Sequence, residues 1–229
     1  MRVLGLETAG RAVSAALVEG SEVLAEAWLA APQQHCRELI SLVDWCLGKA
    51  GTTLAAVDGL AVSLGPGSFT GLRIGLATAK ALALAVKKKL VGVPTLEAIA
   101  AAAPHFAGIV CPVLPSRPGE VYLAFLRRRG DSWDYLVPPR ALPPRDLPSL
   151  LPPGEEKVLL VGEAAPLVAS LVEGGAKSRL LVADPVAGRL QAARIAYLGS
   201  KKFAAGLADD PLRLEPLYLR PPGITARGR

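Results

Sequence analysis

The sequence is poor in the residues that build metal centres, disulfide frameworks and base-stacking surfaces. Its 229 residues include two histidines, three cysteines and only 5% aromatic residues. His35 and His105 lie 70 positions apart, and neither has a histidine or cysteine three or four positions away. This excludes a zinc or iron site built from neighbouring ligands. The cysteines form no C-x-x-C pair, and their odd, low number is typical of reduced thiols in the cytosol.

Long hydrophobic runs and strong charge are also scarce. The longest uncharged stretch, residues 98–116, is broken by Pro104 and Pro112, so it predicts a helix end and a buried strand, not a membrane span. Met1 leads directly into a strand-like run that Glu7 interrupts, unlike a secretory signal. We therefore expect a cytoplasmic protein without membrane contact. The composition, 51% hydrophobic and 20% charged, is that of a globular protein, and the net charge of +6 permits contact with nucleic acid without requiring it.

The first half of the chain predicts a meander followed by alternating helices and strands. Apolar runs with tight turns between them predict three antiparallel strands at residues 3–8, 12–18 and 22–28. Apolar residues at helical spacing predict a helix over 33–47. Beyond it we expect, in order, a strand at 57–64, a helix at 72–86, a strand at 90–93 and a helix at 95–103. This alternation implies parallel strand pairing.

The second half repeats the same order in a weaker form. Strands are expected at residues 109–114, 121–126, 133–137, 158–161 and 180–183, and helices from about residue 165 and over 190–205. The proline-rich residues 138–153 predict a surface loop, and residues 221–229 a loose tail. We therefore expect an N-terminal lobe at 1–104 and a partly degenerate C-terminal lobe at 105–229, which contains the final helix.

This order of elements is typical of the α/β actin-like, or ribonuclease H-like, ATPase fold, in which two lobes with mixed sheets enclose a cleft that can hold a nucleotide. Such lobes usually carry a carboxylate at the end of the first strand, where it reaches a metal-bound phosphate. Glu7 occupies that place here. We favour the simpler interpretation that Glu7 bonds to the adjacent turn, because a single acid rarely forms a metal site.

The most specific motif is the glycine-rich turn GPGSFTGLRIG at residues 65–75, between an apolar strand and an apolar helix. It matches neither the P-loop nor the dinucleotide fingerprint G-x-G-x-x-G, and Ser68 does not stand in the G-x-S-x-G elbow of hydrolases. We expect Ser68 and Thr70 to cap the helix and to face a bound group or a partner chain.

The helix expected at 72–86 is apolar on nearly every face, so it should be buried on nearly every side. Gly75, Ala79 and Ala83 recur every four positions and would allow close helix packing. Either the chain's own second layer covers this helix, or a second subunit does. We favour the subunit interface, because apolar patches of this extent usually mark contacts.

Several motifs together resemble the TsaB (YeaZ) family, a subunit of the bacterial machinery for tRNA threonylcarbamoyladenosine synthesis. The turn at 65–75 resembles the family's signature. The other matching motifs are LGLET at 4–8, His35 followed by ELI at 38–40, RPGEVY at 117–122 and LYLRP at 217–221. The resemblance covers nearly the whole chain.

The resemblance implies an actin-like fold and a non-catalytic subunit, since the catalytic paralogue TsaD carries an H-x-x-x-H metal motif that this sequence lacks. It implies a heterodimer with a TsaD-like transferase, engagement of a TsaE-like ATPase and contact with tRNA through the complex. The first two helices would form the interface, and a homodimer of the isolated chain would use the same surface. The interface residues expected on these helices are His35, Leu39, Leu72, Arg73, Leu76, Ala79 and Ala83.

The sequence departs from the family pattern in two places. The first strand ends in Glu7-Thr8-Ala9 instead of Asp-Thr-Ser, and Pro115-Ser116 replaces the Asp-Ala that usually precedes the arginine of the second-lobe motif. Both changes remove short acids that could touch a metal-bound nucleotide. We expect no resident cofactor; if ATP does bind, the expected contacts are Glu7, Gly67 and Ser68.

The leading hypothesis is a non-catalytic scaffold that pairs with and activates a TsaD-like transferase, which modifies N6 of adenosine 37 in tRNA. The alternative is a free-standing actin-like nucleotide phosphotransferase, or a peptidase-like enzyme, with ATP or a metal held by Glu7 and the glycine turn. A third hypothesis is a tRNA-binding module that relies on positive charge, whose affinity should fall steeply with salt. Arg73 could pair with a partner's acid or within the chain.

Overall fold

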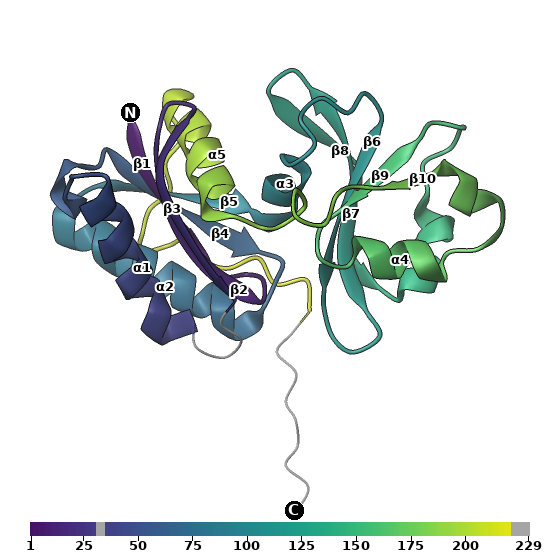
Figure 1. Cartoon of the computed structure of the whole chain (residues 1–229), viewed down its shortest axis with the longest axis horizontal. Helices are drawn as coiled ribbons and strands as arrows, with labels where there is room; N and C mark the ends of the chain where they lie inside the picture. Colours follow the sequence, from purple (N-terminus) through teal and green to yellow (C-terminus); the bar gives the residue numbers. More distant parts are fainter. Residues whose placement is uncertain (31–34, 221–229) are drawn as a thin grey trace, which may run out of the picture.

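The computed structural model describes residues 1–30 and 35–220, apart from the side chains of His35 and Cys36. Two lobes lie side by side, each built on a five-stranded mixed sheet with helices against it (Figure 1). The α/β architecture of two lobes that the sequence predicts is confirmed. The tail expected at 221–229 lies outside the described residues.

The first sheet has the strand order β3-β2-β1-β4-β5. Strands β1 (Arg2–Glu7), β2 (Ala12–Glu19) and β3 (Glu22–Ala30) form the expected antiparallel meander. Strands β4 (Gly59–Gly65) and β5 (Lys89–Pro94) extend the sheet on the other side of β1, in parallel. Strands β1 and β2 are buried almost throughout. This explains their nearly continuous apolar sequences, because both faces of the strands are covered.

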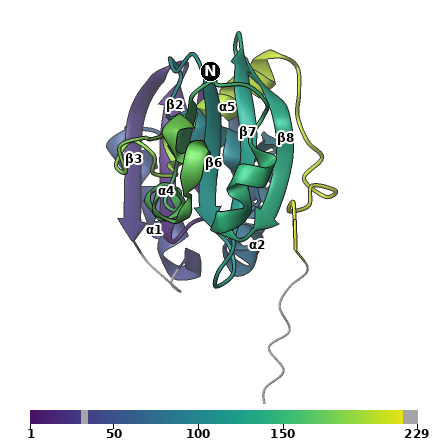
Figure 2. The ribbon, with the colours of Figure 1, turned by 90° about the vertical axis from the view of Figure 1, so that its right-hand side faces the viewer.

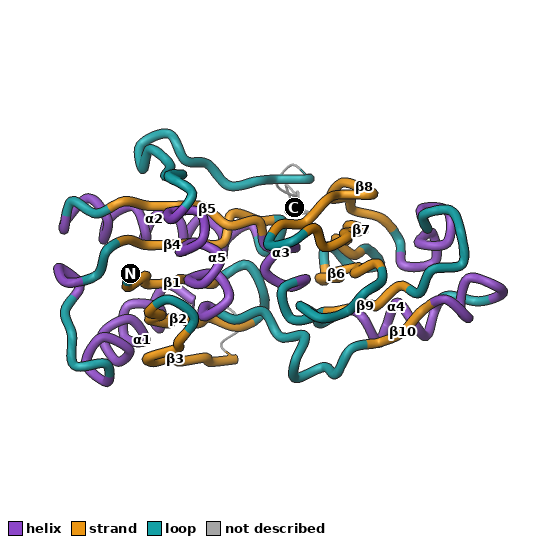
Figure 3. The backbone as a smooth tube through the Cα atoms, turned by 90° about the horizontal axis from the view of Figure 1, so that it is seen from above, coloured by secondary structure: helices purple, strands orange, loops and turns teal. Residues whose placement is uncertain are grey.

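Helices cover both faces of the first sheet (Figures 1 and 3). Helices α1 (His35–Lys49) and α2 (Phe69–Val86) cover one face, and α5 (Ala192–Ala204) covers the other. Alternating residues of β1 meet the two layers, as strand geometry requires. Leu4 and Leu6 pack in the core under α1 and α2, whereas Val3 packs in the core that contains Ile195 of α5.

The second sheet repeats the connectivity of the first, with the order β10-β9-β6-β7-β8. Figure 2 shows this lobe toward the viewer, with α4 (Ala165–Leu171) in front of the sheet. The predicted repeat of the two halves is therefore confirmed at the level of topology. The strands of this sheet are β6 (Ile109–Pro115), β7 (Val121–Arg129), β8 (Ser132–Leu142), β9 (Val158–Val161) and β10 (Leu180–Val182). Three 3₁₀ turns complete the described chain, at Leu54–Ala56, Pro144–Leu150 and Gly174–Arg179.

The last helix of each half packs against the sheet of the other half. Helix α3 (Thr95–Ala100), which follows β5, contacts β6 and β7 of the second sheet as well as β4 and β5. Helix α5, which follows β10, lies on β1, β2 and β4 of the first sheet. We expected the final helix to be part of the C-terminal lobe, and the structure corrects this. A Cβ at Gly5 of β1 would overlap the carbonyl oxygen of Ala192, so glycine permits this close approach of α5.

The proline-rich segment also differs from expectation. Instead of a surface loop over residues 138–153, strand β8 continues to Leu142 and a 3₁₀ turn follows. Pro138 and Pro139 fit because β8 is the edge strand of its sheet and its register with β7 shifts beside them, between the pairs Phe125–Val137 and Leu123–Arg140. Edge strands and bulges are the places where a sheet tolerates proline, which cannot donate a ladder hydrogen bond.

Candidate partner-binding face and interlobe cleft

The glycine turn packs directly on the end of β1. A Cβ at Gly71 would overlap the carbonyl oxygen of Thr8, and one at Gly75 would overlap the hydroxyl of Thr8. A Cβ at Gly67 would lie 2.6 Å from the Cβ of Ala9. These contacts are within the chain, so close packing of α2 against β1 is itself a sufficient physical reason for the glycine motif.

Ser68 is the N-cap of α2, as expected. Its Oγ accepts a hydrogen bond from the amide of Gly71 at 3.2 Å, and its own amide donates to the carbonyl of Ala9 at 2.8 Å. Thr70 lies one residue inside the helix, so its prediction as a cap is wrong. Ser68 and Gly67 are thus held by the chain's own turns. Their expected contact with a nucleotide stays a prediction.

Glu7 is buried at the end of β1 and bonds to the turn that follows it. Its Oε1 accepts hydrogen bonds from the amides of Ala9 and, at 3.3 Å, Gly10. The pKa of Glu7 is raised to about 7, mainly by burial, and the nearby carboxylate of Glu163 contributes in the same direction. The hydroxyl of Ser63 and the amides of Ala9 and Gly10 lower this pKa. Oε2 of Glu7 makes no hydrogen bond of ordinary geometry to any described residue.

This geometry matches the simpler interpretation of Glu7. Glu7 is 2% exposed, and one of its two carboxylate oxygens accepts hydrogen bonds from backbone amides of the adjacent turn. The described residues also contain no group of three or more histidine, cysteine, aspartate or glutamate side chains that could hold a metal ion. Contact of Glu7 with a nucleotide stays a prediction.

The expected interface residues of α1 and α2 are mostly turned inward. Leu39, Leu76, Ala79 and Ala83 are each at most 5% exposed, because they belong to the core between these helices and the first sheet. Leu72 is 1% exposed and belongs to the core that also contains Leu96 of α3. The structure corrects the prediction that these five side chains contact a partner. The helical spacing of these residues marks an apolar face that packs on the sheet. Because both sides of α2 are apolar, the sequence alone does not show which side packs on the sheet and which side is left for a partner.

The opposite side of the same helices exposes apolar groups. We define the α1–α2 face as Ile40 and Trp45 of α1 with Ala77, Ala81 and Leu84 of α2, all of which are exposed. Only a third of the residues of α2 are buried, although the helix is apolar enough to span a membrane by length and composition alone. A helix this apolar with one uncovered side is typical of a contact surface.

Arg73 lies at the edge of this face and is held within the chain. Its guanidinium stacks over the ring of Phe69 at 4.0 Å, and its Nε donates to the hydroxyl of Tyr218 at 3.1 Å. The ring of Tyr218 lies 5.0 Å from that of Phe69. The C-terminal segment therefore fixes the first turn of α2. His35 begins α1, and its side chain lies outside the described residues.

A cleft with a volume of about 800 Å³ opens between the lobes. The RPGEVY motif at 117–122 contributes Arg117 and Glu120 to its walls. Sequence reasoning did not connect this motif with the other lining residues, because they come from segments that are far apart in the chain. The charged and aromatic side chains that line it are Arg11, Trp28, Arg117, Glu120, Arg145, Glu163 and Arg189. Glu7, Gly67 and Ser68 are not among its lining residues.

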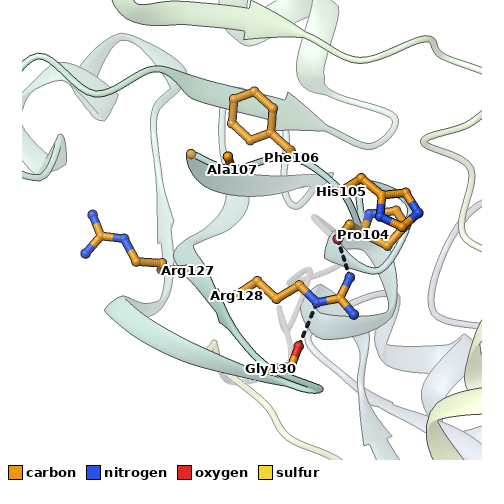
Figure 4. Close-up of a pocket in the computed structure, with 8 residues that line it drawn as sticks. Pro104, His105, Phe106, Ala107, Arg127, Arg128 and Gly130 are labelled. Carbon is orange, nitrogen blue, oxygen red and sulfur yellow. Dashed lines mark hydrogen bonds between the residues drawn. The ribbon is translucent and has the colours of Figure 1, made fainter.

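A smaller pocket of about 370 Å³ lies beside the β7–β8 turn and includes His105 (Figure 4). Its guanidinium groups are already engaged. Arg128 bridges the carbonyl oxygens of Pro104 and Gly130, and Arg127 pairs with Glu156. These contacts leave the pocket with little capacity for a ligand of its own.

Comparison with known proteins places this architecture in a family. The family model described as "TsaD: tRNA N6-adenosine threonylcarbamoyltransferase" matches residues 29–202. The solved structure of YeaZ from Pseudomonas aeruginosa superposes with a TM-score of 0.81 at 26% identity, covering 95% of this chain and 99% of that one.

Two curated relatives match this chain to different extents. The tRNA threonylcarbamoyladenosine biosynthesis protein TsaB of Bacillus subtilis (strain 168) is 27% identical over 217 residues, which cover 93% of this chain and 95% of the relative. The tRNA N6-adenosine threonylcarbamoyltransferase of Methylorubrum extorquens (strain PA1) is 35% identical over 153 residues, which cover 57% of this chain and only 44% of the transferase. The match to the Bacillus subtilis protein therefore extends over both lobes, whereas the match to this transferase covers less than half of the transferase.

Proposed function

This chain belongs to the TsaB/YeaZ family, and we propose that it is a non-catalytic subunit that pairs with and activates a TsaD-like transferase. Its role lies in tRNA threonylcarbamoyladenosine biosynthesis. The transferase would attach the threonylcarbamoyl group to N6 of adenosine 37, and this chain would hold the transferase in its active form. A TsaE-like ATPase and tRNA would join through the complex, which would act in the cytoplasm.

The uncovered α1–α2 face is the observation that carries the pairing proposal. Ile40, Trp45 and Leu84 are each more than 40% exposed. Ala77 and Ala81 share the exposed side of α2 with Leu84, because these three positions are spaced by four and three residues, and their small side chains let a partner helix approach closely. Burying such a surface against a second apolar face is favourable by about 25 cal/mol per Å². The same face would form a homodimer when the chain is alone.

The non-catalytic assignment rests on the chemistry of the described residues. The carboxyl group of Glu7 is buried and bonded to its own turn, and the glycine motif serves helix packing. The only two histidines of the chain are 70 residues apart in sequence. A free-standing phosphotransferase would need several side chains that together hold a metal ion in the cleft, and a peptidase would need an activated nucleophile.

Size-exclusion chromatography with light scattering tests the pairing. The chain alone should elute as a homodimer, and mixing with a purified TsaD-like transferase should convert it to a 1:1 complex. Ala81→Arg should weaken both assemblies at least tenfold, because an unpaired guanidinium would be buried at the contact. Leu212→Arg serves as the matched control, since Leu212 is 77% exposed on the C-terminal segment and outside the α1–α2 face.

The outcomes separate pairing from catalysis. No complex at micromolar concentration, or a complex that Ala81→Arg leaves unchanged, would contradict the proposed interface. In a transferase assay, this chain alone should form no product, and its addition to the transferase should stimulate modification. Glu7→Gln should stimulate equally well. Loss of stimulation by a Glu7→Gln protein that still forms the complex would support the enzyme alternative instead.

A further inference from the structure

The C-terminal segment, residues 207–220, follows α5 and runs along the edge strand β5 of the first sheet. Asp209 forms an antiparallel bridge with Leu90, and its carboxylate accepts a hydrogen bond from the amide of Gly92 at 2.7 Å. A segment in this place covers an edge that would otherwise be open to another strand. Figure 3 shows that it continues from the side of β5 to β8, so it also reaches the second lobe.

The later part of this segment holds the beginning of α2. The amide of Leu217 donates a hydrogen bond of 2.7 Å to the carbonyl oxygen of Leu64, at the end of β4. The ring of Tyr218 lies 5.0 Å from that of Phe69, and its hydroxyl accepts a hydrogen bond from Nε of Arg73 at 3.1 Å. Because Arg73 lies at the edge of the α1–α2 face, Tyr218 contacts the helix turn from which this face continues.

The end of the segment is fastened to the second lobe. A guanidinium nitrogen of Arg220 lies 3.0 Å from Oε1 of Glu120, and it also donates to the carbonyl oxygen of Ala141 at 3.4 Å. Glu120 immediately precedes β7, and Ala141 belongs to β8. The side chain of Glu120 is 25% exposed and that of Arg220 41% exposed, so salt screens this ion pair less than a fully exposed one.

Three sequence motifs from distant parts of the chain are therefore joined here. The glycine turn at 65–75 and the RPGEVY motif at 117–122 belong to different lobes, and the LYLRP motif at 217–221 contacts both. Tyr218 and Arg220 are two positions apart, and a two-residue stretch reaches at most about 7 Å. This leaves little slack between the contact with α2 and the contact with the second lobe.

We propose that residues 217–220 act as a clasp between the lobes, through which the second lobe sets the position of the beginning of α2 and thereby the affinity of the α1–α2 face for its partner. This inference rests on the proposed pairing with a transferase. It makes Tyr218 and Arg220 positioning residues, because Tyr218 acts through Arg73 and Arg220 acts through Glu120. Coupling between two sites commonly changes an affinity by about 5- to 150-fold.

Isothermal titration of the full chain with a purified TsaD-like transferase tests the clasp. Glu120→Ala changes a residue outside the α1–α2 face, and it should weaken the complex by about fivefold or more. Tyr218→Phe removes only the hydroxyl that accepts from Arg73, and it should also weaken the complex. The double variant should bind no more weakly than the weaker single variant, because both changes break the same connection. Additive losses would indicate two independent effects and would overturn the proposal.

A matched control comes from the same segment. Arg213 pairs with Asp210 within the segment, at 3.5 Å, and its side chain is 90% exposed. Arg213→Ala therefore removes an arginine and an ion pair without touching either contact of the clasp, and it should leave the affinity for the transferase unchanged. An equal loss of affinity in Arg213→Ala and Glu120→Ala would mean that general charge is responsible, which would overturn the proposal.

Hydrogen exchange of the chain alone reports on the clasp without a partner. Glu120→Ala and Arg220→Ala should both accelerate exchange at the amides of Leu72 and Leu217, which bond to Ser68 and Leu64, and leave β2 unchanged. Unchanged exchange at these two amides, or an affinity for the transferase that Glu120→Ala does not alter, would overturn the clasp alone. A wild-type chain that forms no complex would instead contradict the proposed pairing, and with it any effect of the clasp on affinity.

Discussion

The hydroxyl of Thr8 donates a hydrogen bond of 2.7 Å to the carbonyl oxygen of Gly71, 63 residues further along the chain. This bond joins the end of β1 to the first turn of α2. It is possible because Gly71 and Gly75 have no side chains to hold the helix away from Thr8. The glycine motif thus places α2 on the sheet, and with it the exposed side of α2 that we propose as the contact surface.

Replacing Gly71 with alanine should destabilise the protein by about 2 kcal/mol or more, as overpacked cores do. The added methyl group would meet the backbone carbonyl of Thr8, which cannot rotate away. Urea denaturation followed by circular dichroism measures the change. Gly48→Ala is the matched control, because Gly48 is an exposed position of α1 with no atom near an added Cβ. This variant should be more stable by about 0.5–1 kcal/mol.

The raised pKa of Glu7 predicts a dependence of stability on pH. Between pH 4.5 and about 7, Glu7 stays protonated in the folded chain but is ionised in the unfolded chain. The folded state therefore binds the extra proton, and stability falls as the pH rises through this window. Glu7→Gln should lack this component, so above pH 7 it should exceed the wild type in free energy of unfolding by about 3 kcal/mol.

Urea denaturation of both proteins at several pH values checks this prediction. Below pH 4.5 the two proteins should have similar stabilities, because Glu7 is then protonated in both states. A constant difference between them across the whole pH range would mean that Glu7 titrates normally in the folded chain.

Helix α5 should stabilise the first lobe more than the second lobe, whose strands precede it in sequence. Ile195→Ala removes a fully buried side chain from the core that α5 shares with the first sheet. We expect a loss of about 2–5 kcal/mol, the usual result of such truncations. Leu212→Ala, at a position 77% exposed, should change stability by less than about 0.5 kcal/mol.

Hydrogen exchange shows where the Ile195→Ala effect acts. Amide exchange should accelerate in β1 and β4, which α5 covers, more than in β9 and β10. Faster amide exchange confined to the second sheet would contradict the packing of α5 on the sheet of the first half.

Two cysteine thiols should be unreactive in the folded protein. Burial raises the pKa of Cys46 to about 11 and that of Cys111 still further, so the reactive thiolate of Cys46 is only about 10⁻³ of the total at pH 8. The thiol of Cys46 also donates to the carbonyl of Ala15. Iodoacetamide at pH 8 should leave both unmodified until guanidinium unfolds the chain.

Mass spectrometry of tryptic peptides provides the readout. Cleavage after Arg37 separates Cys36 from Cys46, so the three thiols are followed individually. Rapid labelling of Cys46 under native conditions would mean that α1 separates readily from the first sheet.

The sequence by itself determined the local elements and the repeat. Period-two and helical spacing depend only on neighbouring residues, and they predicted the meander, the parallel strands and both halves in the correct order. Ser68 was identifiable as a cap for the same reason. The prolines at 138 and 139 misled the prediction, because an edge position and a bulge, which depend on β7, make them acceptable in a strand.

Only the tertiary structure decided which side of each helix is free and which distant residues meet. Leu72 and Leu76 are as apolar as Leu84, but only contact with the sheet shows that the first two are covered and the third is exposed. Helices α3 and α5 each pack against the sheet of the other half, and this arrangement depends on contacts between the lobes. Arg11 and Arg145 belong to turns in different halves, and their approach to one cleft follows from the arrangement of the lobes, which no local pattern encodes.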